Sequence, residues 1–471
     1  MKYIFFAIVS LLICCRKFVQ VAPPVTSLVS TSVFTNNLTA SAAVSGLLHQ
    51  MAAPNTPFGG GENGISILLG LSSDEFALFP TTKEMLALTY TNALHSNMNS
   101  APRLWNNLYN YIYQANAVIT GLEQSDQVST MLKQQLIGEA KFIRALCHLY
   151  LVNIYGDVPV VTTTDYRINA FVSRIAEKDV YKQIINDLLD AKALLTIEYR
   201  TPLGGITNER VRPNKAAAAA LLARVYLFTE DWVKAEDLAT KIINNEFGQF
   251  SLSSNFATVF TKASSEAIFQ LQGTIMGANT ADAGLFLLTI NGGPSSSYPL
   301  TLNDALISQF DLGDLRRQNW VNSKIVGNDQ FYFSYKYKLF STPDMAPNEY
   351  PILLRLAEQY LIRAEARAKQ NNLPGAISDI NIIKNRAGLL PIDDTLGNSQ
   401  VVGEIIKERQ LELFTEYGHR WIDLKRLHYL DSVMTHVTFS KGGTWHPYSS
   451  LYPIPIDEID ANPNLVQNPG Y

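Results

Sequence analysis

The chain has 471 residues, of which 47% are hydrophobic, and 38 Lys and Arg against 42 Asp and Glu give it a net charge of −4. A charge this balanced, without a basic stripe, argues against a nucleic-acid-binding surface. The length allows a large core and more than one domain, and no run after the amino terminus is long and uncharged enough to span a membrane.

The amino terminus is predicted to be a secretory signal. Lys2 supplies a small positive region, and residues 3–13 form an apolar run shorter than a membrane span. The run ends in Leu-Ile-Cys-Cys at 12–15, which resembles a bacterial lipobox, whose last cysteine is acylated and becomes the first mature residue. A plain signal peptide cut elsewhere is the alternative. Lipidation would leave Cys147 alone on an apolar helix, so stability is expected to come from packing and not from disulfides.

No Asp or Glu precedes Glu62. We interpret the segment between the cysteine pair and this residue as a tether that reaches from the membrane.

The body of the chain is predicted to be mainly helical. Apolar and aromatic residues recur at helical spacing over 104–122 and again from about 131 to 155, where Gly156 and Pro159 end the pattern. Two long helices with a short join predict an αα-hairpin.

Two later segments predict further hairpins of the tetratricopeptide kind. Ala223 and Ala235 lie twelve residues apart, and so do Ala364 and Ala376. Small residues at these positions let the two helices of a hairpin cross closely. The intervals between hairpins are unequal, so we expect a frame of degenerate units with long insertions and not an uninterrupted solenoid.

Two regions read as loops projected from this frame. Residues 52–103 are rich in Gly, Pro, Asn, Thr and Ser, and residues 246–349 contain a flexible Gly-Gly-Pro-Ser-Ser-Ser-Tyr-Pro turn at 292–299. Short strands are predicted around 266–272 and 331–340. Loops on a rigid frame are where binding usually occurs.

Motifs along most of the chain resemble the SusD/RagB family of nutrient-uptake lipoproteins. Residues 353–389 read LLRLAEQYLIRAEARAKQNNLPGAISDINIIKNRAGL, and residues 404–426 read EIIKERQLELFTEYGHRWIDLKR. Further agreement lies in the start CRKF at 15–18 with VAPP at 21–24, in GEAKFIRA at 138–145, in YGDVP at 155–159, in LYPIP at 451–455 and in the close NLVQNPGY at 464–471. The resemblance selects Cys15 over Cys14 as the acylated residue.

The resemblance implies a mainly α fold, a SusD-like α-α superhelix of tetratricopeptide-like hairpins with loop-rich insertions and a few short strands. It divides the chain into a signal at 1–15, an amino-terminal region at 16–245 and a carboxy-terminal region at 246–471 that includes the insertion 246–349. It also implies a lipid-anchored outer-membrane protein that faces the cell exterior. The acidic residues that often mark surface export in these bacteria are missing after Cys15, which weakens the outward orientation.

For function, the resemblance implies a lid that captures a glycan fragment and closes over a SusC-like TonB-dependent transporter. Ligand must then favour the closed state through differential contacts. A peptide ligand, as in the RagB branch, is one alternative. A surface glycoside hydrolase and a protein-binding helical scaffold are the others.

The sequence gives little support for catalysis. It contains none of the common metalloprotease, hydrolase, P-loop or Cys-x-x-Cys motifs, and the turn at Gly59–Gly61 lacks the Lys-Ser/Thr of a phosphate cradle. No cofactor is expected, and structural calcium is not readable from the sequence. Two opposed carboxylates would suffice for a glycosidase, which keeps that alternative open.

The charged motif near the carboxy terminus is interpreted as structural. We expect Glu412 and Glu416, four apart on one helical face, to be neutralised by Arg409 and Arg420 in a lattice of ion pairs. Asp423 belongs to the same motif, and His419 is expected to be packed and not to act as a base. Gly418 is expected to separate two helices, and Leu413, Tyr417, Trp421 and Leu424 to form a buried stripe.

An oligosaccharide site needs flat aromatic faces and polar groups at the rim. In the loops, the candidates for these roles are Asp74, Phe79, Tyr90, Asn92, His95, Asn97, Asn99, Tyr298, Trp320 and Trp445. Asp74 would serve equally well as a helix or turn cap.

Overall fold

The computed structural model describes residues 33–98, 103–290, 292–341 and 346–471. The signal region, with Cys14 and Cys15, and the candidate Asn99 lie outside the described residues, so the predictions made for them stay predictions.

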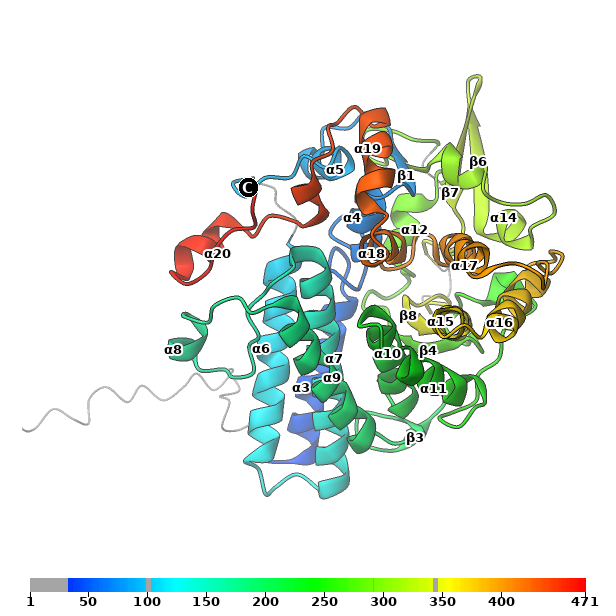
Figure 1. Cartoon of the computed structure of the whole chain (residues 1–471). Helices are drawn as coiled ribbons and strands as arrows, with labels where there is room; N and C mark the ends of the chain where they lie inside the picture. Colours follow the sequence, from blue (N-terminus) through cyan, green and yellow to red (C-terminus); the bar gives the residue numbers. More distant parts are fainter. Residues whose placement is uncertain (1–32, 99–102, 291, 342–345) are drawn as a thin grey trace, which may run out of the picture.

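Long helices packed side by side form the frame of the molecule (Figure 1). They are α3 (Asn37–Ala52), α6 (Leu104–Glu123), α7 (Thr130–Tyr155), α9 (Glu177–Leu194), α10 (Lys215–Phe228), α11 (Trp232–Ile243), α15 (Leu356–Lys369), α16 (Leu373–Arg386) and α17 (Asn398–Leu413). Helix α6 packs on α7, α10 on α11 and α15 on α16, which confirms the three predicted hairpins. The mainly helical fold is confirmed, and α9, which packs on both α7 and α10, was not predicted.

The small residues of the two later hairpins have the predicted role. Ala223, Ala235, Ala364 and Ala376 are all fully buried between helices. Polar caps begin the second helix of each hairpin: the side chain of Asp231 accepts a hydrogen bond from the Lys234 backbone N–H, and Asn372 accepts one from Gly375. Such caps satisfy backbone donors that the helix leaves unpaired.

The tether prediction is wrong for the part of that segment that the structure describes. Helix α3 packs against α6 and α7, and it buries Ala40, Val44, Leu47 and Met51 in the main core. The absence of acidic residues before Glu62 therefore reflects, in part, a helix that faces an apolar core.

Shorter elements and loops surround the frame: in Figure 1 most of them lie at the top and right, α8 and α20 lie at the left, and β3 lies at the lower edge. The helices among them are α4 (Ile65–Ser72), α5 (Glu84–Tyr90), α8 (Tyr166–Asn169), α12 (Ala281–Phe286), α13 (Asp304–Ile307), α14 (Leu315–Trp320), α18 (His419–Arg426), α19 (Leu430–Ser440), α20 (Ile456–Ala461) and the 3-10 turns η1 (Phe256–Thr258) and η2 (Pro447–Ser450). The strands are β1 (Phe76–Leu78), β2 (Tyr199–Arg200), β3 (Ile206–Thr207), β4 (Ala267–Gln270), β5 (Leu300–Leu302), β6 (Val321–Val326), β7 (Asp329–Ser334) and β8 (Ile352–Arg355).

The strands form four antiparallel pairs, β1 with β5, β2 with β3, β4 with β8 and β6 with β7. Strands β4 and β7 correspond to the two predicted strands, although β7 ends at Ser334 and not near Phe340. The pairing of β1 with β5 matters most for the site, because it joins the two predicted loop regions.

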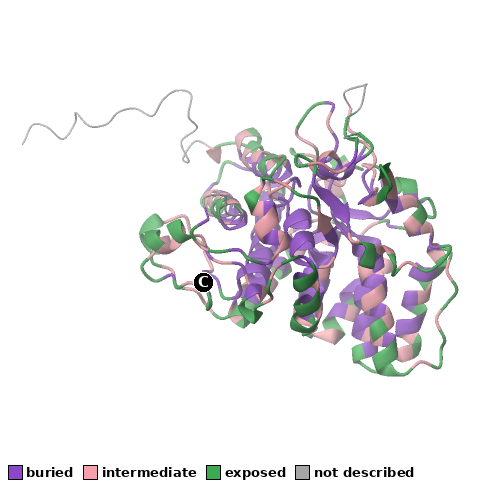
Figure 2. Cartoon of the chain, turned by 90° about the horizontal axis from the view of Figure 1, so that it is seen from above, coloured by how far each residue is buried: buried purple, intermediate pink, exposed green. Residues whose placement is uncertain are grey.

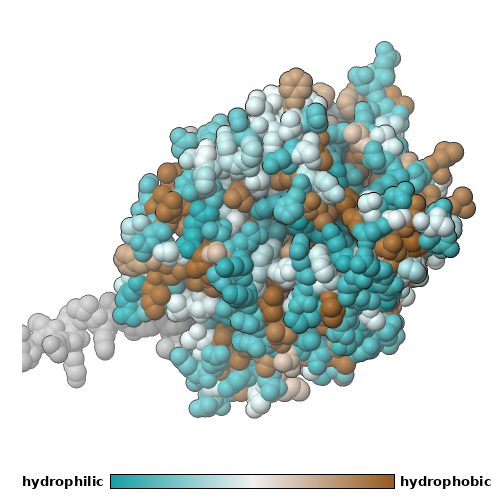
Figure 3. All heavy atoms as spheres, viewed as in Figure 1, coloured by the Kyte–Doolittle hydropathy of each residue, from teal (hydrophilic) through white to brown (hydrophobic). Residues whose placement is uncertain are grey.

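Buried residues line the facing sides of the helices and the short strands between them (Figure 2). The largest core cluster runs from Ala40 to Leu465, so it draws on both sides of the predicted boundary at 245/246. A second cluster, which contains Trp320, lies under the loop-rich region. Within the described residues, no helix combines the length and apolar character needed to cross a bilayer. On the face seen in Figure 3, apolar side chains lie in small groups among polar ones.

Candidate functional site

The charged motif of the carboxy-terminal region forms a buried ion-pair lattice, as predicted. Its partners differ from the prediction. Arg409 pairs with Asp423, at 2.7 Å between Nε and Oδ2, and Arg420 pairs with Asp74 on another segment. Neither arginine neutralises Glu412 or Glu416, because their guanidinium groups pair with other carboxylates.

The cations that face Glu412 and Glu416 come from four distant segments. Arg355 donates to both carboxylates, Lys336 donates to Glu416, and Arg386 and Arg316 donate to Glu412. Burial alone would raise the pKa of Glu412, but the guanidinium groups of Arg386, Arg355 and Arg316 hold it below its ordinary value. The lattice thus ties α17 to β8, α16, α14 and the segment after β7, which is a structural role.

The expectation that Glu412 and Glu416 share one helical face is wrong, because α17 ends at Leu413 and Glu416 lies beyond it. The expectations for Gly418 and His419 agree with the structure. Gly418 begins α18 with φ +71, and a Cβ there would lie 2.3 Å from Leu69, so a side chain would be both strained and crowded. His419 is buried, and burial together with nearby arginines holds its pKa well below its ordinary value. A neutral, enclosed imidazole fits packing and not proton transfer from solvent.

Glu75, beside Asp74, gives a testable pH dependence. Burial raises its pKa to about 8, and one carboxyl oxygen accepts a hydrogen bond from the Thr415 N–H at 3.0 Å. Because the folded pKa lies above the ordinary 4.5, its contribution to stability is complete below about pH 4.5 and is lost as the pH rises through 8. Glu75→Gln, which keeps a neutral side chain, should therefore be the more stable protein at pH 8 and equal to the native protein near pH 4.5.

Urea denaturation of both proteins across this pH range measures the effect. The difference in free energy of unfolding should grow by up to about 1.4 kcal/mol per pH unit. Glu123→Gln, at the exposed end of α6, is the matched control and should track the native protein. Parallel curves for Glu75→Gln and the native protein would show that Glu75 is ionised in the fold.

Three of the predicted ligand-binding residues have structural roles. Trp320 was predicted to contact a ligand, and this prediction is corrected. Its exposed fraction is 0%, and its indole N–H donates to the Phe256 carbonyl in the second core. Asn92 is also buried, and its amide donates to the carbonyl of Ser72 and the hydroxyl of Thr438. Asp74 forms a two-pronged ion pair with Arg420.

Two predicted aromatics are half-buried. The indole N–H of Trp445 donates to Asp431 at 2.8 Å, and its ring packs edge-on against Trp421. Tyr90 lies below the ammonium group of Lys441, 4.8 Å from its ring centre. Both rings are therefore engaged by contacts within the protein.

His95 and Asn97 line an open hollow of about 850 Å³ beside the carboxy terminus, and they bond each other at 2.7 Å. His446 and Tyr448 stack on its other side with ring centres 5.0 Å apart. The stacking covers one face of each ring, and Tyr471 packs edge-on against Tyr448.

The remaining two candidates, Phe79 and Tyr298, come from the two loop regions that the structure brings together. Strand β1 pairs with β5, and just beyond them the Phe79 N–H donates to the carbonyl of Pro299. Lys83 fixes the same contact, since its ammonium group bonds the Ser297 carbonyl at 2.7 Å and Glu62 at 2.6 Å. Phe79 also packs edge-on against Phe331.

Tyr298 lines a cavity of about 450 Å³, which we call the Tyr298 cavity. Its walls are the turn at 54–62, the loop 273–280, helix α12 and Phe340. Tyr298 and Phe340 are 37% and 49% exposed, so both rings keep free surface. The polar residues of the lining are Asn55, Glu62, Thr274, Asn279 and Thr280.

The glycine turn that the sequence singled out forms one wall of this cavity. Gly60 and Gly61 both have φ +85, and the Gly61 N–H donates to Asp282 of α12 at 2.9 Å. A Cβ on Gly60 would lie 2.4 Å from the same carboxylate. The glycines therefore allow the turn to pack tightly on α12 and shape the cavity.

Sequence reasoning missed Phe340 and Asn55. Phe340 was placed at the end of a predicted strand, but β7 ends at Ser334, and the Phe340 carbonyl accepts a hydrogen bond from the Asn279 N–H. In the described parts of the chain, no three His, Cys, Asp or Glu side chains are grouped so that they could hold a metal ion.

The architecture defines a class: helical-hairpin proteins with a loop-built face at one end of the frame. A model of the SusD family (SusD_RagB) matches residues 303–471, and a model described as "Starch-binding associating with outer membrane" matches residues 72–227. Together they span more than half of the chain. The chain belongs to the SusD/RagB family.

Individual relatives are distant in sequence. SusD-like protein P25 of Formosa agariphila is 25% identical over 429 residues, which cover 78% of this chain and 79% of the relative. Starch-binding protein SusD of Bacteroides thetaiotaomicron is 23% identical over 437 residues, which cover 74% and 75%. A solved structure of a laminarin-binding SusD-like protein has a TM-score of 0.75 at 22% identity, covering 93% of this chain and 100% of that one.

Proposed function

We propose that this protein binds a glycan in the Tyr298 cavity without cleaving it. The observation that carries the proposal is the meeting of two part-exposed aromatic rings, Tyr298 and Phe340, over one cavity with polar groups at its edge. Aromatic faces pack against the apolar faces of sugar rings, and amide, hydroxyl and carboxylate groups bond sugar hydroxyls.

The lining of the cavity argues against hydrolysis. Among its described residues, Glu62 is the one acidic side chain, and it is paired with Lys83. Glycosidases of the common kinds need two carboxyl groups on opposite sides of the scissile bond. Most other buried carboxylates of the carboxy-terminal region are in ion pairs, and the buried Asp282 of α12 accepts a hydrogen bond from the Gly61 N–H.

The names of relatives agree with a glycan as ligand. One is a starch-binding protein, one solved neighbour binds laminarin, and another is a surface glycan-binding protein from Bacteroides fluxus. Because these chains differ in ligand and are about one-fifth identical to this one, they support the ligand class and not a particular sugar.

We further propose that Cys15 carries lipid, that the protein is held at the outer membrane facing the exterior, and that it closes as a lid over a SusC-like TonB-dependent transporter. The lipobox-like Leu-Ile-Cys-Cys and the family's association with the outer membrane support this. Mass spectrometry of the mature amino terminus should find a diacylglyceryl cysteine at Cys15. Purification from native membranes in mild detergent should recover a TonB-dependent barrel with it, and recovery of the protein alone would contradict the lid.

Calorimetry with the chain from Lys17 onward tests the binding site. Titration with soluble glycans, oligosaccharides and peptide mixtures identifies the ligand, and Tyr298→Ala and Phe340→Ala should each then weaken its binding roughly tenfold, equivalent to about 1.4 kcal/mol. Tyr448→Ala is the matched control, because Tyr448 is 38% exposed but lines the other hollow. Unchanged affinity in the first two variants, with loss in the third, would move the site to that hollow.

Product analysis after each titration separates the alternatives. An intact glycan supports a binding protein, whereas shortened chains would identify a hydrolase. Binding of peptides alone would assign the protein to peptide uptake. Binding of none of these ligands by the native protein would overturn the proposal.

A further inference from the structure

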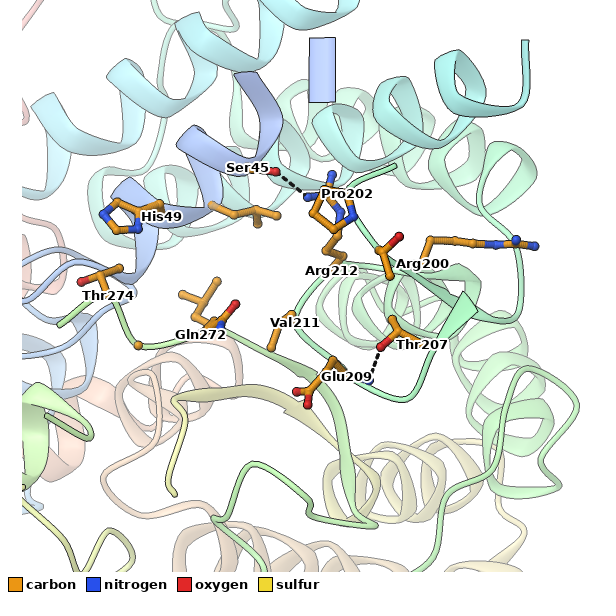
Figure 4. A pocket seen from close by; sticks show the side chains of 14 residues that line it. Ser45, His49, Arg200, Pro202, Thr207, Glu209, Val211, Arg212, Gln272 and Thr274 are labelled. Atoms are coloured by element: carbon orange, nitrogen blue, oxygen red, sulfur yellow. Dashed lines mark hydrogen bonds between the residues drawn. The ribbon is translucent and has the colours of Figure 1, made fainter. Parts of the chain in front are cut away.

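A second cavity lies next to the Tyr298 cavity, between α3 and the β2–β3 hairpin (Figure 4). It has a volume of about 480 Å³, and we call it the His49 cavity. Its wall contains polar side chains from three separate segments: Ser45, His49, Arg200, Thr201, Thr207, Glu209, Arg212, Gln272 and Thr274. We propose that the two cavities form one groove and that the His49 cavity is a second subsite for the same uncharged oligosaccharide. This inference rests on the proposed function.

The two cavities share a wall. Gly273 and Thr274 line both of them. A Cβ on Gly273 would make ordinary van der Waals contact with the carbonyl oxygens of Ala278 and Asn279, at 3.8 and 3.9 Å. Those two residues line the Tyr298 cavity, so the missing side chain leaves the passage between the cavities open.

The segment that forms the shared wall, with Gly273 and Thr274, is anchored to the core. It follows β4, which pairs with β8, and the Leu271 N–H donates to the Pro351 carbonyl at 2.9 Å. On the opposite side of the His49 cavity, Arg200 braces the β2–β3 hairpin by donating to the Gly204 carbonyl. Because both walls of the groove are already fixed, the protein loses little conformational entropy when it binds an oligosaccharide chain there.

The arginines of the second cavity are already engaged. Arg212 forms a buried ion pair with Glu139. It also donates to the Ser45 hydroxyl (Figure 4). Arg200 donates to Glu198 as well as to the hairpin. Their charges are therefore satisfied within the protein and do not form an anion site.

Two polar groups in the His49 cavity remain available to a ligand. Among the described residues, neither the imidazole of His49 nor the carboxylate of Glu209 has a hydrogen-bond or ion-pair partner, and both side chains are exposed. They come from different elements, α3 and the segment after β3, and both line the cavity. Glu62 is neutralised by Lys83, whereas the Glu209 carboxylate keeps its negative charge in the His49 cavity, which disfavours an anionic chain.

The groove predicts a dependence on chain length. Each cavity alone is within the size range of pockets that hold a small ligand, so a short oligosaccharide fills the first and a longer one reaches the second. Affinity for neutral gluco-oligosaccharides, measured by calorimetry in β-1,3- and α-1,4-linked series from disaccharide to octasaccharide, should rise with length and then level off.

Gly273→Phe should block the passage. We expect it to remove the gain in affinity for long chains, roughly tenfold, and to leave the shortest bound chain within about twofold of the native value. Gly403→Phe, at an exposed helix glycine with no atom within 4 Å of its Cβ, is the control and should leave the whole series unchanged. His49→Ala combined with Glu209→Ala should weaken long chains alone, and it keeps the test valid if Gly273→Phe does not fold.

The outcomes separate this inference from the proposed function. If no oligosaccharide or polysaccharide binds the native protein, both are overturned. If short chains bind and Tyr298→Ala weakens them, but neither Gly273→Phe nor the double variant alters the length dependence, the single cavity stands and the groove is wrong. Equal affinity for an oligogalacturonate and a neutral chain of the same length would overturn the assignment to uncharged glycans.

Discussion

Arg355→Met is expected to lower the free energy of unfolding by about 3–5 kcal/mol, because it removes one partner of buried charges. The Arg355 side chain is almost fully buried at the end of β8. Its Nε donates to Glu416 at 2.7 Å, one terminal nitrogen donates to the Glu412 carboxylate at 2.6 Å, and the other donates to the Glu412 carbonyl at 2.7 Å. Methionine fills much of the volume of the arginine side chain. It donates no hydrogen bond, so the two carboxylates and the Glu412 carbonyl each lose a donor inside the protein.

Urea denaturation at neutral pH measures this loss. Lys182→Met is the matched control, since Lys182 pairs with Asp179 on the exposed surface of α9 and an exposed pair contributes about 0–1 kcal/mol. Equal effects of the two substitutions would contradict the lattice as the element that joins α17 to the rest of the fold. In the Arg355→Met protein, the carboxy-terminal region should also open before the rest of the fold. Faster hydrogen exchange of its backbone amides would measure this.

Trp320→Ala is expected to cost about 3–5 kcal/mol of stability. The ring is fully buried, with Phe256 and Phe260 packed edge-on at 5.0 and 5.4 Å between ring centres. The Lys336 ammonium group lies 4.9 Å from the same ring, so the residue also supports a cation of the lattice. The substitution therefore leaves a cavity between the second core cluster and the ion-pair lattice around Glu412 and Glu416.

The same substitution separates a packing role from a ligand role. Trp320→Phe should recover part of the stability and bind the glycan as tightly as the native protein, because no part of the ring reaches the surface. Trp445→Ala, at a half-buried ring, should cost less stability than Trp320→Ala. A loss of glycan affinity in Trp320→Phe without a loss of stability would restore Trp320 as a ligand-binding residue.

The candidate site shows where prediction from sequence stops. The turn at 292–299 and the loop near Phe79 were both identified, and Tyr298 was named. Their meeting depends on the pairing of β1 with β5, two strands of three residues separated by more than two hundred positions. The pairing of two such short and distant strands cannot be recognised from the local sequence, because the side chains packed beneath the strands set its register.

The charged motif gives the clearest contrast between the two kinds of information. Its spacing indicated that Glu412 and Glu416 would need cations, and the structure confirms that they have them. The cations are Arg355, Lys336, Arg386 and Arg316, while the arginines nearest in sequence pair with Asp423 and Asp74. Charge pairing inside a protein follows distance in space, which the order of residues along one helix does not give.

The sequence by itself determined the parts that depend on local spacing. Apolar periodicity defined α6 and α7, and alanines twelve residues apart defined the two later hairpins, because helix formation and close helix crossing depend on neighbours within a few turns. Tertiary structure alone decided that α3 joins the core, that Trp320 is enclosed, and that Gly273 lies between two cavities. These features arise from contacts between distant segments, whose free energy is gained only when the whole core assembles.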